Sequence, residues 1–532
     1  MTNALYYGDN LAVLRESIAD ESVDLIYLDP PFNSQASYNV LFRSPTGEQS
    51  QAQIEAFEDT WHWNAAAEEA FDDVMRSGKT DTAEMLRAMR SFLRENDMMA
   101  YLTMMAIRLL ELRRVLKPTG SIYLHCDPTA SHYLKILLDA VFSIRNFHNE
   151  ISWRRSNPKS HGSVNFPNCR DIIFRYTKFD KFVFNKVYGE HDPAYITKAY
   201  KYVDKSGRKY RLLPLLNPND DRPNLRYEFL GVTRVWRWTK ERMKKAYRDG
   251  LVIQLKPGAV PQYKKYLDDS AGRTITNDWH DIKPIGTGEE LGYPTQKPLA
   301  LLERIILASS NENDVVLDPF CGCGTTIHAA QKLGRQWVGI DITHLAISLI
   351  EKRLNDAFPG IEYEVHGTPK DLEGARALAV ADKYQFQWWA VSLVDAVPFA
   401  GKKKGADSGI DGIVYFKPHP KTTEKGIVSV KGGAHVNVGM IRDLAHVVER
   451  EYAKVGLFVT LAEPTGPMLT EAVKAGFYET EYGRFPKIQI LTVEELLAGK
   501  KPQLPWSEPK AFRKARRETP DPNAKQGNLK LG

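Results

Sequence analysis

Two short polar segments, far apart in the chain, each come directly after an apolar run. Asp29-Pro30-Pro31-Phe32 follows the run 23–28, and Asp318-Pro319-Phe320 follows the run 315–317. Apolar runs of this length are typical of buried parallel strands. Open α/β sheets bind their ligands at the carboxyl ends of the strands, so both segments are expected at one functional edge.

The first segment suits the activation of an amine on a nucleic-acid base. The lone pair of such an amine is delocalised into the ring, so a catalyst must pull the nitrogen toward tetrahedral geometry. Asp29 and the carbonyl of Pro30 can accept the amine hydrogens, and proline stiffens the turn that carries them. Phe32 offers a flat face to a base rotated out of a duplex. A plain turn is the alternative, since Asp-Pro is a common turn pair.

The second segment suits a cofactor that carries a nucleoside. Gly322 and Gly324 let the backbone approach a ligand closely, and Thr325 can cap the following helix. Asp341 ends the next strand, at the spacing of a carboxylate that binds ribose hydroxyls. A dinucleotide site needs a third glycine where this chain has Ile327, so a nucleoside with a short zwitterionic arm fits better. An ordinary strand–loop–helix joint is the alternative.

The elements around both segments alternate between strands and helices. In the first part of the chain the patterns predict strands at 4–7, 23–29 and 121–126 and helices at 97–116 and 133–141. In the second part they predict strands at 315–317 and 336–342 and helices at 299–308, 325–333 and 344–355. This alternation predicts an α/β fold with a parallel sheet covered by helices on both faces. Residues 156–290 break the rhythm with many Pro, Asn and Gly, so they are predicted to be an inserted module.

Length and composition limit the class of protein. A chain of 532 residues exceeds one hydrophobic core, so two or three domains are expected, while a net charge of +6 is weak evidence for a nucleic-acid partner. The four cysteines are too few for a disulfide framework, and Cys321 and Cys323 lack the second pair that would complete a metal site. The chain shows no basic-then-apolar leader and no bilayer-length apolar run, so we expect a cytoplasmic location and no membrane partner.

Five segments, taken in order, resemble motifs of the β-class amino DNA methyltransferases of restriction–modification systems. They are Tyr7-Gly8-Asp9-Asn10-Leu11, Asp29-Pro30-Pro31-Phe32-Asn33, Tyr293-Pro294-Thr295-Gln296-Lys297-Pro298, Asp318-Pro319-Phe320 with Gly322 and Gly324, and Asp341. The resemblance covers residues 1–360. It implies a Rossmann-like, S-adenosylmethionine-dependent methyltransferase fold with permuted motif order, in which the catalytic motif precedes the recognition region and the cofactor motif comes last.

The resemblance also assigns roles to individual residues. It implies that Asp29, Pro30, Pro31 and Phe32 are catalytic. It implies cofactor binding by Asp9, Tyr293, Thr295, Lys297, Asp318, Pro319, Phe320, Gly322, Gly324, Thr325 and Asp341. Within this set, Asp9 contacts the cofactor adenine and Asp341 the ribose. Asp at the first catalytic position suggests methylation of adenine N6, because cytosine-N4 members mostly carry Ser there; Phe in place of the commoner Tyr leaves the choice of base open.

The inserted region 156–290 is the candidate for target recognition in DNA. Residues 195–266 mix Lys and Arg with aromatic residues, and DNA contacts need cations for phosphates and flat partners for exposed bases. The candidate DNA-binding residues are Arg154, Arg155, Arg234, Arg237, Lys244 and Lys245. A solvated charged helix over a small aromatic core is the alternative. His125 and Asp127, at the end of strand 121–126, are secondary candidates for contact with cofactor or base.

Residues 373–498 are predicted to have strands of their own at 409–416, 426–430, 456–461 and 487–491 and a helix near 440–454. Asp411 begins one strand and Lys431 ends the next, a pattern that resembles the PD-(D/E)xK restriction-endonuclease fold, in particular its Mrr-like branch. Ser429 stands where a second acid or Gln is usual, so metal affinity should fall unless another acid such as Glu449 reaches in. Mg²⁺ at Asp411 is therefore expected only if this domain cleaves DNA, and a non-cutting domain is equally open. The basic tail 501–532 is predicted to be disordered.

Together these observations predict a methyltransferase domain at 1–155 and 291–360 with an inserted recognition region at 156–290. The leading hypothesis is a site-specific DNA adenine-N6 methyltransferase that uses S-adenosylmethionine and flips its target base. The alternatives are a cytosine-N4 methyltransferase, a methyltransferase fused to an active Mg²⁺-dependent endonuclease, and a DNA-binding protein with the cofactor as a structural ligand. Double-stranded DNA is the expected partner, with a homodimer or a separate restriction subunit as further possibilities.

Overall fold

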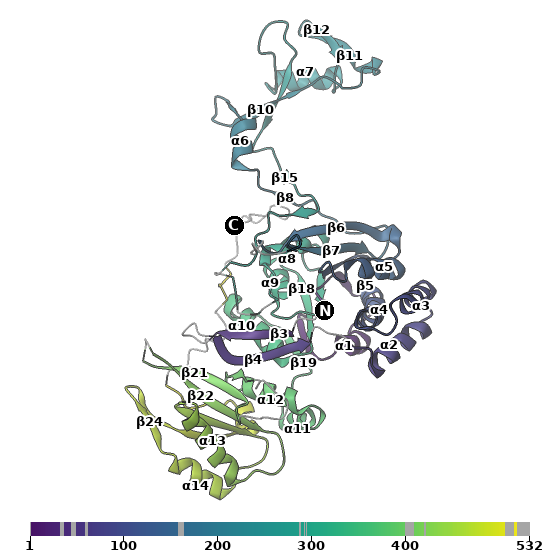
Figure 1. The fold of residues 1–532 in the computed structure, drawn as a ribbon. Coiled ribbons are helices and arrows are strands. Elements are labelled where there is room, and N and C mark those ends of the chain that lie inside the picture. Colours follow the sequence, from purple (N-terminus) through teal and green to yellow (C-terminus); the bar gives the residue numbers. More distant parts are fainter. Residues whose placement is uncertain are drawn as a thin grey trace. The chain divides into compact units, whose positions relative to one another are not determined.

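The computed structural model describes residues 2–31, 37–43, 49–58, 62–157, 164–286, 289–291, 293, 295–399, 409–419, 422–505 and 515–518. Phe32, Asn33 and Pro294, which belong to the motifs, lie outside the described residues. The chain divides into two compact units, Met1–Asn185 with Asn277–Pro522, and Lys186–Thr276. Figure 1 labels their helices and strands, and each unit is described by itself below.

A nine-stranded sheet forms the centre of the first unit. Its strand order is β16 (Asp278–Trp279), β6 (Phe147–Arg154), β7 (Arg170–Thr177), β5 (Leu116–Cys126), β2 (Val23–Leu28), β17 (Val315–Asp318), β18 (Gln336–Asp341), β1 (Ala4–Tyr7), β19 (Glu364–His366). All neighbours are parallel except β7, which is antiparallel to both β5 and β6. The predicted α/β fold class is confirmed, and the antiparallel strand makes the sheet mixed rather than wholly parallel.

Helices cover both faces of this sheet, as the alternation predicted (Figure 1). One face packs against α1 (Asn10–Ser17), α2 (Ala65–Arg76), α3 (Thr80–Leu93), α4 (Asp97–Val115) and α5 (Ser131–Phe142). The other face meets α8 (Leu299–Ser309), α9 (Thr325–Lys332) and α10 (His344–Ala357). There the Tyr123 hydroxyl lies 2.7 Å from Ser309 Oγ on α8, and the Trp337 indole donates to Gln331 on α9 over 2.8 Å. The buried apolar runs therefore serve as the double-sided core strands that their composition predicted.

The two central strands end at a topological switch point. β17 and β2 are adjacent, but the chain leaves β17 through α9 toward β18 and leaves β2 through α4 toward β5, in opposite directions along the sheet. Such a reversal opens a crevice at the carboxyl ends of the two strands. Asp318 is the last residue of β17 and Asp29 directly follows β2, so both predicted segments border this crevice.

The inserted unit is shorter than the predicted range 156–290. β7 and β16 both pair into the central sheet, which leaves Lys186–Thr276 as the separate unit. It contains α6 (Pro193–Ala199), β9 (Tyr202–Val203), β10 (Lys209–Pro214), β11 (Arg226–Phe229), β12 (Val232–Val235), α7 (Lys240–Arg248), β13 (Val252–Ile253) and β14 (Gln262–Tyr266). Its small core gathers around Trp236, which is fully buried and donates its indole N–H to the carbonyl of Tyr227 over 2.8 Å.

The carboxyl-terminal part of the first unit has a second, five-stranded sheet. Its order is β20 (Val397–Pro398), β21 (Gly412–His419), β22 (Thr422–Lys431), β23 (Val455–Thr460), β26 (Ile488–Thr492). Two hydrophobic cores flank this sheet. One includes residues of α11 (Leu372–Ala381), α12 (Lys383–Ser392) and α15 (Val493–Leu497), and the other includes residues of α13 (Val438–Arg450) and α14 (Gly466–Lys474). The four strands and the helix that the sequence predicted here are all present, with ends shifted by a few residues.

The hairpin β3 (Ser37–Arg43) and β4 (Gln49–Glu58) was not predicted, and neither were α2, α3 and α14. Of the predicted disordered tail, 501–505 and 515–518 are described, and Glu518 Oε1 lies 3.1 Å from His328 Nε2 on α9. Among the described helices, none combines the length and hydropathy that a membrane span requires.

Candidate active site

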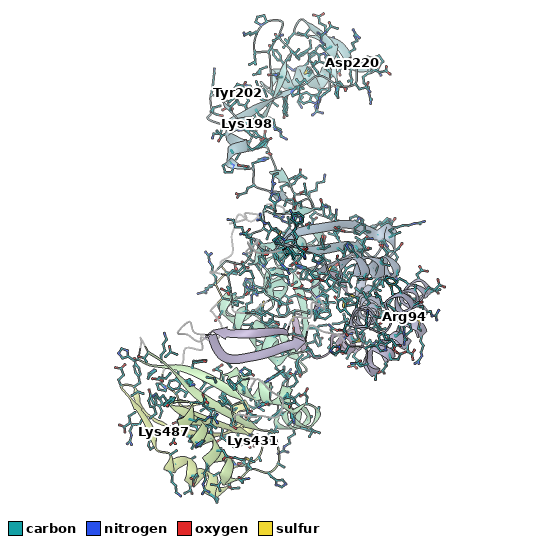
Figure 2. All side chains as sticks on the ribbon, in the orientation of Figure 1. Arg94, Lys198, Tyr202, Asp220, Lys431 and Lys487 are labelled. Carbon is teal, nitrogen blue, oxygen red and sulfur yellow. The ribbon has the colours of Figure 1, made fainter. Side chains whose placement is uncertain are left out.

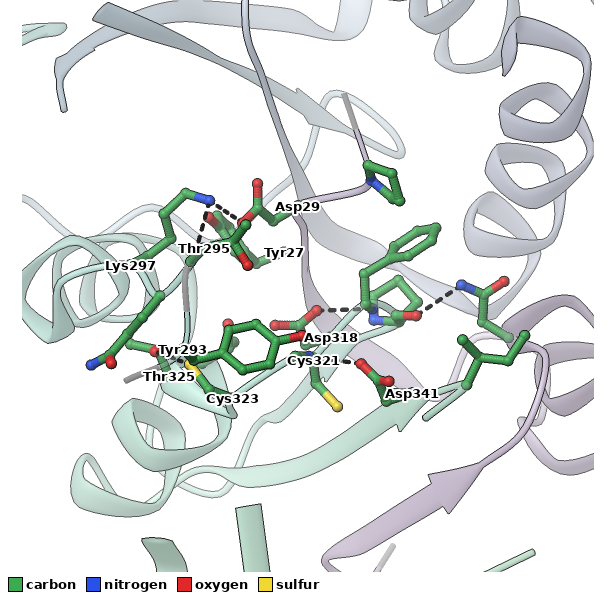
Figure 3. Close-up of a pocket in the computed structure, with 18 of the residues that line it drawn as sticks. Tyr27, Asp29, Tyr293, Thr295, Lys297, Asp318, Cys321, Cys323, Thr325 and Asp341 are labelled. Atoms are coloured by element: carbon green, nitrogen blue, oxygen red, sulfur yellow. Dashed lines mark hydrogen bonds and ion pairs between the residues drawn. The ribbon is translucent and has the colours of Figure 1, made fainter. Parts of the chain in front are cut away.

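A cavity of about 340 Å³ occupies the switch-point crevice. Residues from both predicted segments line it, together with others that the motifs named (Figure 3). The lining includes Asp9, Asn10, Tyr27, Asp29, Pro31, Arg108, Tyr293, Thr295, Lys297, Asp318, Pro319, Phe320, Gly322, Thr325 and Asp341. Asp29 and Gly322 thus share one cavity, as the hypothesis required. Pro30 and Gly324 are not among the described residues that line it.

Asp29 has one oxygen engaged and one available. Its Oδ2 forms an ion pair with Nζ of Lys297, which points toward it in Figure 3. Its Oδ1 is buried and accepts no hydrogen bond from the described residues. A buried carboxylate oxygen without a donor is costly, and a donor on a ligand would satisfy it. The geometry therefore suits acceptance of an N–H from a group bound in the cavity.

A buried histidine lies behind Asp29. His125 Nδ1 is 4.0 Å from Asp29 Oδ1 and 2.8 Å from the Tyr27 hydroxyl, while His125 Nε2 is 3.2 Å from Asp171 Oδ2. Asp171 Oδ1 in turn lies 3.2 Å from a guanidinium nitrogen of Arg155. Burial raises the pKa of Asp171, but the hydrogen bond from His125 and the charge of Arg155 outweigh it, so the pKa ends below its ordinary value.

The glycine loop has the backbone that a close-fitting ligand site requires. Gly322 and Gly324 have φ angles of +49° and +72°, which L-residues with a side chain rarely adopt. A Cβ on Gly324 would come within 2.7 Å of Ile350, and one on Gly322 would lie 3.4 Å from the Tyr293 ring. The predicted cap residue is wrong by one position: Gly324 is the N-cap of α9, and the hydroxyl of Thr325 accepts from Arg353 over 3.1 Å.

Asp341 holds this loop to the end of β18. Its Oδ2 accepts from the Gly322 backbone N–H over 2.9 Å, and its Oδ1 accepts from the N–H and the hydroxyl of Thr343 over 2.9 and 2.8 Å. Burial raises the pKa of Asp341 to about 6. Burial likewise raises the pKa of Asp318 to about 7, with added repulsion from Asp29 and Asp341. Because crowded carboxylates repel one another, a cationic ligand would stabilise their charged forms.

The first motif is joined to the main loop through hydrogen bonds. Asp9 caps α1 and also accepts from Arg108 over 2.9 Å. Arg108 donates to the Asn10 side chain over 2.7 Å, and Asn10 donates to the carbonyl of Pro319 over 2.8 Å. Arg108 was not predicted as a site residue. It is nearly fully buried within α4, and the apolar residues around it in the sequence give no sign of a polar site.

Cys321 and Cys323 are both buried and form no disulfide. Within the described part of the chain, no group of three or more His, Cys, Asp and Glu side chains is placed to hold a metal ion.

The candidate DNA-binding residues fall in two places. Arg154 is exposed at the end of β6, and Arg155 follows it, paired with Asp171. Arg234, Arg237, Lys244 and Lys245 are all exposed on the separate unit Lys186–Thr276. Trp236, by contrast, belongs to the core of that unit, so part of the predicted cation–aromatic mixture is structural.

The nuclease-like residues surround the start of β21. Asp411 is buried; its Oδ2 accepts from the Val430 backbone N–H over 2.6 Å, and its Oδ1 contacts the side-chain amide of Gln387 on α12. Ser429 is buried on β22, and Lys431 ends that strand half-buried (Figure 2). Glu449, the candidate second acid, is exposed on α13. Gln387 was not predicted, because nothing in a helical sequence marks one polar residue as facing a distant aspartate.

Comparisons with known proteins match both halves of the chain. The N6/N4 DNA methylase family matches residues 23–352, and a restriction-endonuclease family, the Mrr catalytic domain, matches residues 381–496. The chain is 29% identical over 360 residues to the Type II methyltransferase M.EcaI of Enterobacter cloacae, covering 66% of this chain and 69% of that protein. It is 28% identical over 353 residues to the Mod subunit of the Type III restriction-modification enzyme StyLTI of Salmonella typhimurium, covering 63% of this chain but only half of that protein.

Among solved structures, a putative DNA modification methylase from Thermus thermophilus, complexed with S-adenosyl-L-methionine, matches at 17% identity. The match covers 68% of this chain and 97% of that chain, with a TM-score of 0.34. The two matched families agree with the two resemblances read from the motifs.

Proposed function

Because this chain belongs to the family of N6/N4 DNA methylases, we propose that it methylates adenine N6 in double-stranded DNA, with S-adenosylmethionine as the methyl donor. The observation that supports this proposal most directly is that Asp29 and Gly322 line one cavity. Asp29, whose buried Oδ1 accepts no hydrogen bond from the described residues, lines the same cavity as Gly322 of the glycine loop. Acceptor and donor sites that lie this close bring the reacting groups together, which is the main requirement when the methyl group is already activated.

The residues of the cavity fit S-adenosylmethionine. Gly322 leaves the loop without a side chain where it lines the cavity, and Asp341 is placed to accept from ribose hydroxyls. The raised pKa values of Asp318 and Asp341 indicate a surplus of buried carboxylates, which a cationic ligand relieves. Tyr293, Thr295 and Lys297 would hold its methionine end and Asp9 its adenine. When bound, this cofactor supplies a methyl group on a positively charged sulfur.

The chain's own residues prepare the target amine. Asp29 Oδ1 accepts one amine hydrogen, which pulls electron density onto the nitrogen and turns its lone pair out of the ring. Pro31 lines the cavity with it, and Lys297 fixes the carboxylate by holding Oδ2. A flipped base is required because an amine within a stacked duplex cannot reach a cavity at this depth.

Adenine is favoured over cytosine by Asp29, since the resemblance links this residue type at the first catalytic position to N6 methylation. Modification-sensitive sequencing of DNA from a host that expresses the chain tests the proposal. N6-methyladenine at one short sequence supports it, and N4-methylcytosine at such a site would show that the enzyme class is right but the base is wrong.

We further propose that the unit Lys186–Thr276 recognises the target sequence, with Arg154 and Arg155 contacting the DNA backbone near the flipped base. The support is the exposure of Arg234, Arg237, Lys244 and Lys245 on a unit that branches from the sheet between β7 and β16. Replacing phosphate-contacting lysines should lower affinity for every DNA sequence and reduce its salt dependence. The proposal also includes a partner, which is either a second copy of this chain or a separate restriction subunit. Light scattering with and without DNA measures the mass of the protein in solution and tests for the homodimer.

Cleavage of DNA by residues 381–496 is the second candidate function, favoured by the match to the restriction-endonuclease family. Asp411 with Lys431 is the core of such a site, but the donor set does not fit Mg²⁺ well. Its one carboxylate is already bonded to Val430 N–H and Gln387, and Ser429 offers a weaker ligand than a second acid. No cleavage step is therefore assigned to Asp411 and Lys431. Mg²⁺-dependent cutting that Lys431→Ala abolishes and Asp29→Ala spares would establish this activity.

A further inference from the structure

His125 and Asp29 are neighbours because their strands run in register. β2 and β5 are parallel with Leu28 beside Leu124, so the residues that follow, Asp29 and His125, stand side by side at the active edge. His125 is fully buried, and its Nδ1 lies 4.0 Å from the oxygen of Asp29 that receives no hydrogen bond from the described residues. This placement puts a titratable ring directly behind the carboxylate that contacts the substrate amine.

The partners of His125 indicate which of its nitrogens carries the proton. Asp171 keeps a lowered pKa despite its burial, so it is a carboxylate and can only accept, and His125 Nε2 must donate to it. Burial and the nearby carboxylates raise the pKa of Tyr27 well above its ordinary value, so its hydroxyl keeps its proton and donates to His125 Nδ1. Nδ1 is therefore the basic nitrogen, and it is the one that lies on the side of Asp29.

The proposed methyl transfer leaves a proton that must be removed. An amine nitrogen that has formed a bond to a methyl group carries a positive charge and retains two hydrogens. One N–H bond must break to restore a neutral, conjugated amine. Asp29 is the first acceptor in reach, but its other oxygen is held by Lys297, whose ammonium group has no lone pair and cannot take a proton onward.

We infer that His125 and Asp171 form a proton-accepting pair behind Asp29, an inference that rests on the proposed function. The N–H bond of the methylated amine breaks and an O–H bond forms on Asp29. The Tyr27 hydroxyl, which donates to His125 Nδ1, then relays this proton. The O–H bond on Asp29 breaks as a new O–H bond forms on Tyr27, and the original O–H bond of Tyr27 breaks as an N–H bond forms at His125 Nδ1. Asp29 returns to its charged form. The resulting imidazolium is stabilised by the carboxylate of Asp171, and Arg155, which is exposed, connects this pair to the protein surface. His125 and Asp171 are thus positioning residues that act through Asp29.

Packing alone is the competing explanation for His125. Its ring lies edge-on to Trp153 with a centroid separation of 5.7 Å, and a buried histidine with two hydrogen bonds stabilises the edge of a sheet without any chemistry. The test must therefore distinguish the loss of a proton acceptor at His125 from the loss of its side-chain volume. His148 provides the control, because it is a half-buried histidine of the same sheet, with Nε2 2.9 Å from the Thr177 hydroxyl, and it is not among the residues that line the cavity.

The experiment uses the full chain, a DNA duplex that the wild type methylates and tritium-labelled cofactor, and it measures the single-turnover rate of methyl transfer. His125→Ala should slow this rate about 10²-fold, the usual contribution of general-base assistance, with cofactor affinity within about twofold of wild type. Added imidazole should restore the rate, whereas pyrazole, which has the same size but is a far weaker base, should not. His148→Ala should transfer at the wild-type rate.

Each result decides between the explanations. Equal rescue by imidazole and pyrazole, or an unaltered rate in His125→Ala, would overturn the inference while leaving the methyltransferase intact. If His125→Ala fails to bind cofactor, Asp171→Asn replaces it as a near-isosteric test. That variant should keep cofactor binding and lose about tenfold in rate, and an unchanged rate would refute the pair. Failure of the wild type itself to label DNA would instead contradict the proposed function.

Discussion

Asp29 and Lys297 form an ion pair across a sequence separation of 268 residues. The pair joins the segment at the end of β2, which we propose to be catalytic, to the segment that precedes α8. It also leaves Asp29 with one fixed oxygen and one buried oxygen that accepts no hydrogen bond from the described residues. A carboxylate that is held on one side and available on the other is preorganised to accept a substrate hydrogen, so its removal should affect the chemical step rather than binding.

Asp29→Ala should therefore lower the single-turnover rate of methyl transfer about 10²- to 10³-fold, because the acceptor of the amine hydrogen is lost. Cofactor affinity, measured by isothermal titration, should stay within a few-fold of wild type. Asp20→Ala is the control, since it removes an exposed carboxylate that pairs only at the surface with Arg114. A strong loss of cofactor binding in Asp29→Ala would mean that the residue serves the cofactor site instead.

Gly324→Ala should weaken cofactor binding at least tenfold. Its φ of +72° and the 2.7 Å approach to Ile350 together prevent the loop from keeping its shape around an added Cβ. Gly334→Ala is a closely matched control, because Gly334 has a φ of +71° and open space around its Cβ position. Both variants should lose about 1 kcal/mol of unfolding free energy from the left-handed backbone, but only Gly324→Ala should lose affinity. Equal affinities would show that the loop does not touch the ligand.

Arg353→Met should destabilise the protein by about 1–3 kcal/mol and loosen the cofactor loop, since polar groups of the loop lose a buried donor. Arg353 is buried in α10 and donates to the Cys323 carbonyl over 3.0 Å and to the Thr325 hydroxyl over 3.1 Å. Lys352→Met, at the adjacent position, removes only a helix-surface pair with Asp356 and should be close to neutral in chemical denaturation. A neutral Arg353→Met variant would contradict the role assigned to the buried guanidinium.

Cofactor affinity should fall as pH is lowered through 7 and 6. Burial raises the pKa of Asp318 to about 7 and that of Asp341 to about 6, so both become protonated across this window and lose the charge that favours a cationic ligand. In the ligand-free protein, the contribution of these two carboxyls to folding stability should follow the opposite trend and fall as pH rises. A carboxyl whose pKa is raised by folding stabilises the folded state at low pH, and that contribution is lost as pH rises toward the folded value.

Titrations with cofactor between pH 5.5 and 8 measure the first effect, and Asp341→Asn should flatten its lower part. Chemical denaturation of the ligand-free protein measures the effect on stability. Asp318→Asn should lower the free energy of unfolding more at pH 5 than at pH 8. A cofactor affinity that is constant over this range would contradict the assigned burial of the two carboxylates.

The sequence made the core of the site predictable because its signals are local. An apolar run followed by Asp-Pro marks a strand end, and the glycines after Asp318 mark a close backbone approach, so the convergence of Asp29 and Gly322 in one cavity follows from sheet topology alone. Asp171 was not predicted because it is the second residue of β7, an antiparallel strand in a stretch whose Pro and Asn content resembled an insertion. Arg108 was hidden in the apolar pattern of α4, where a buried cation leaves no periodic signature.

The carboxyl-terminal domain shows a different limit. Its strands could be predicted because alternation and β-branched residues mark them, and the family match confirms the Mrr-like resemblance. The environment of Asp411 could not be predicted, because the contact with Gln387 joins a helix to a strand through tertiary packing that no spacing rule describes.

The central claim is that Asp29 activates an adenine amine within the shared cavity. Its most direct test is the transfer of tritium from methyl-labelled S-adenosylmethionine to duplex DNA in EDTA, followed by analysis of the labelled nucleoside. The proposed mechanism predicts label in N6-methyladenine for the wild type and for Asp20→Ala, and almost none for Asp29→Ala. Label in N4-methylcytosine, or undiminished labelling by Asp29→Ala, would contradict it.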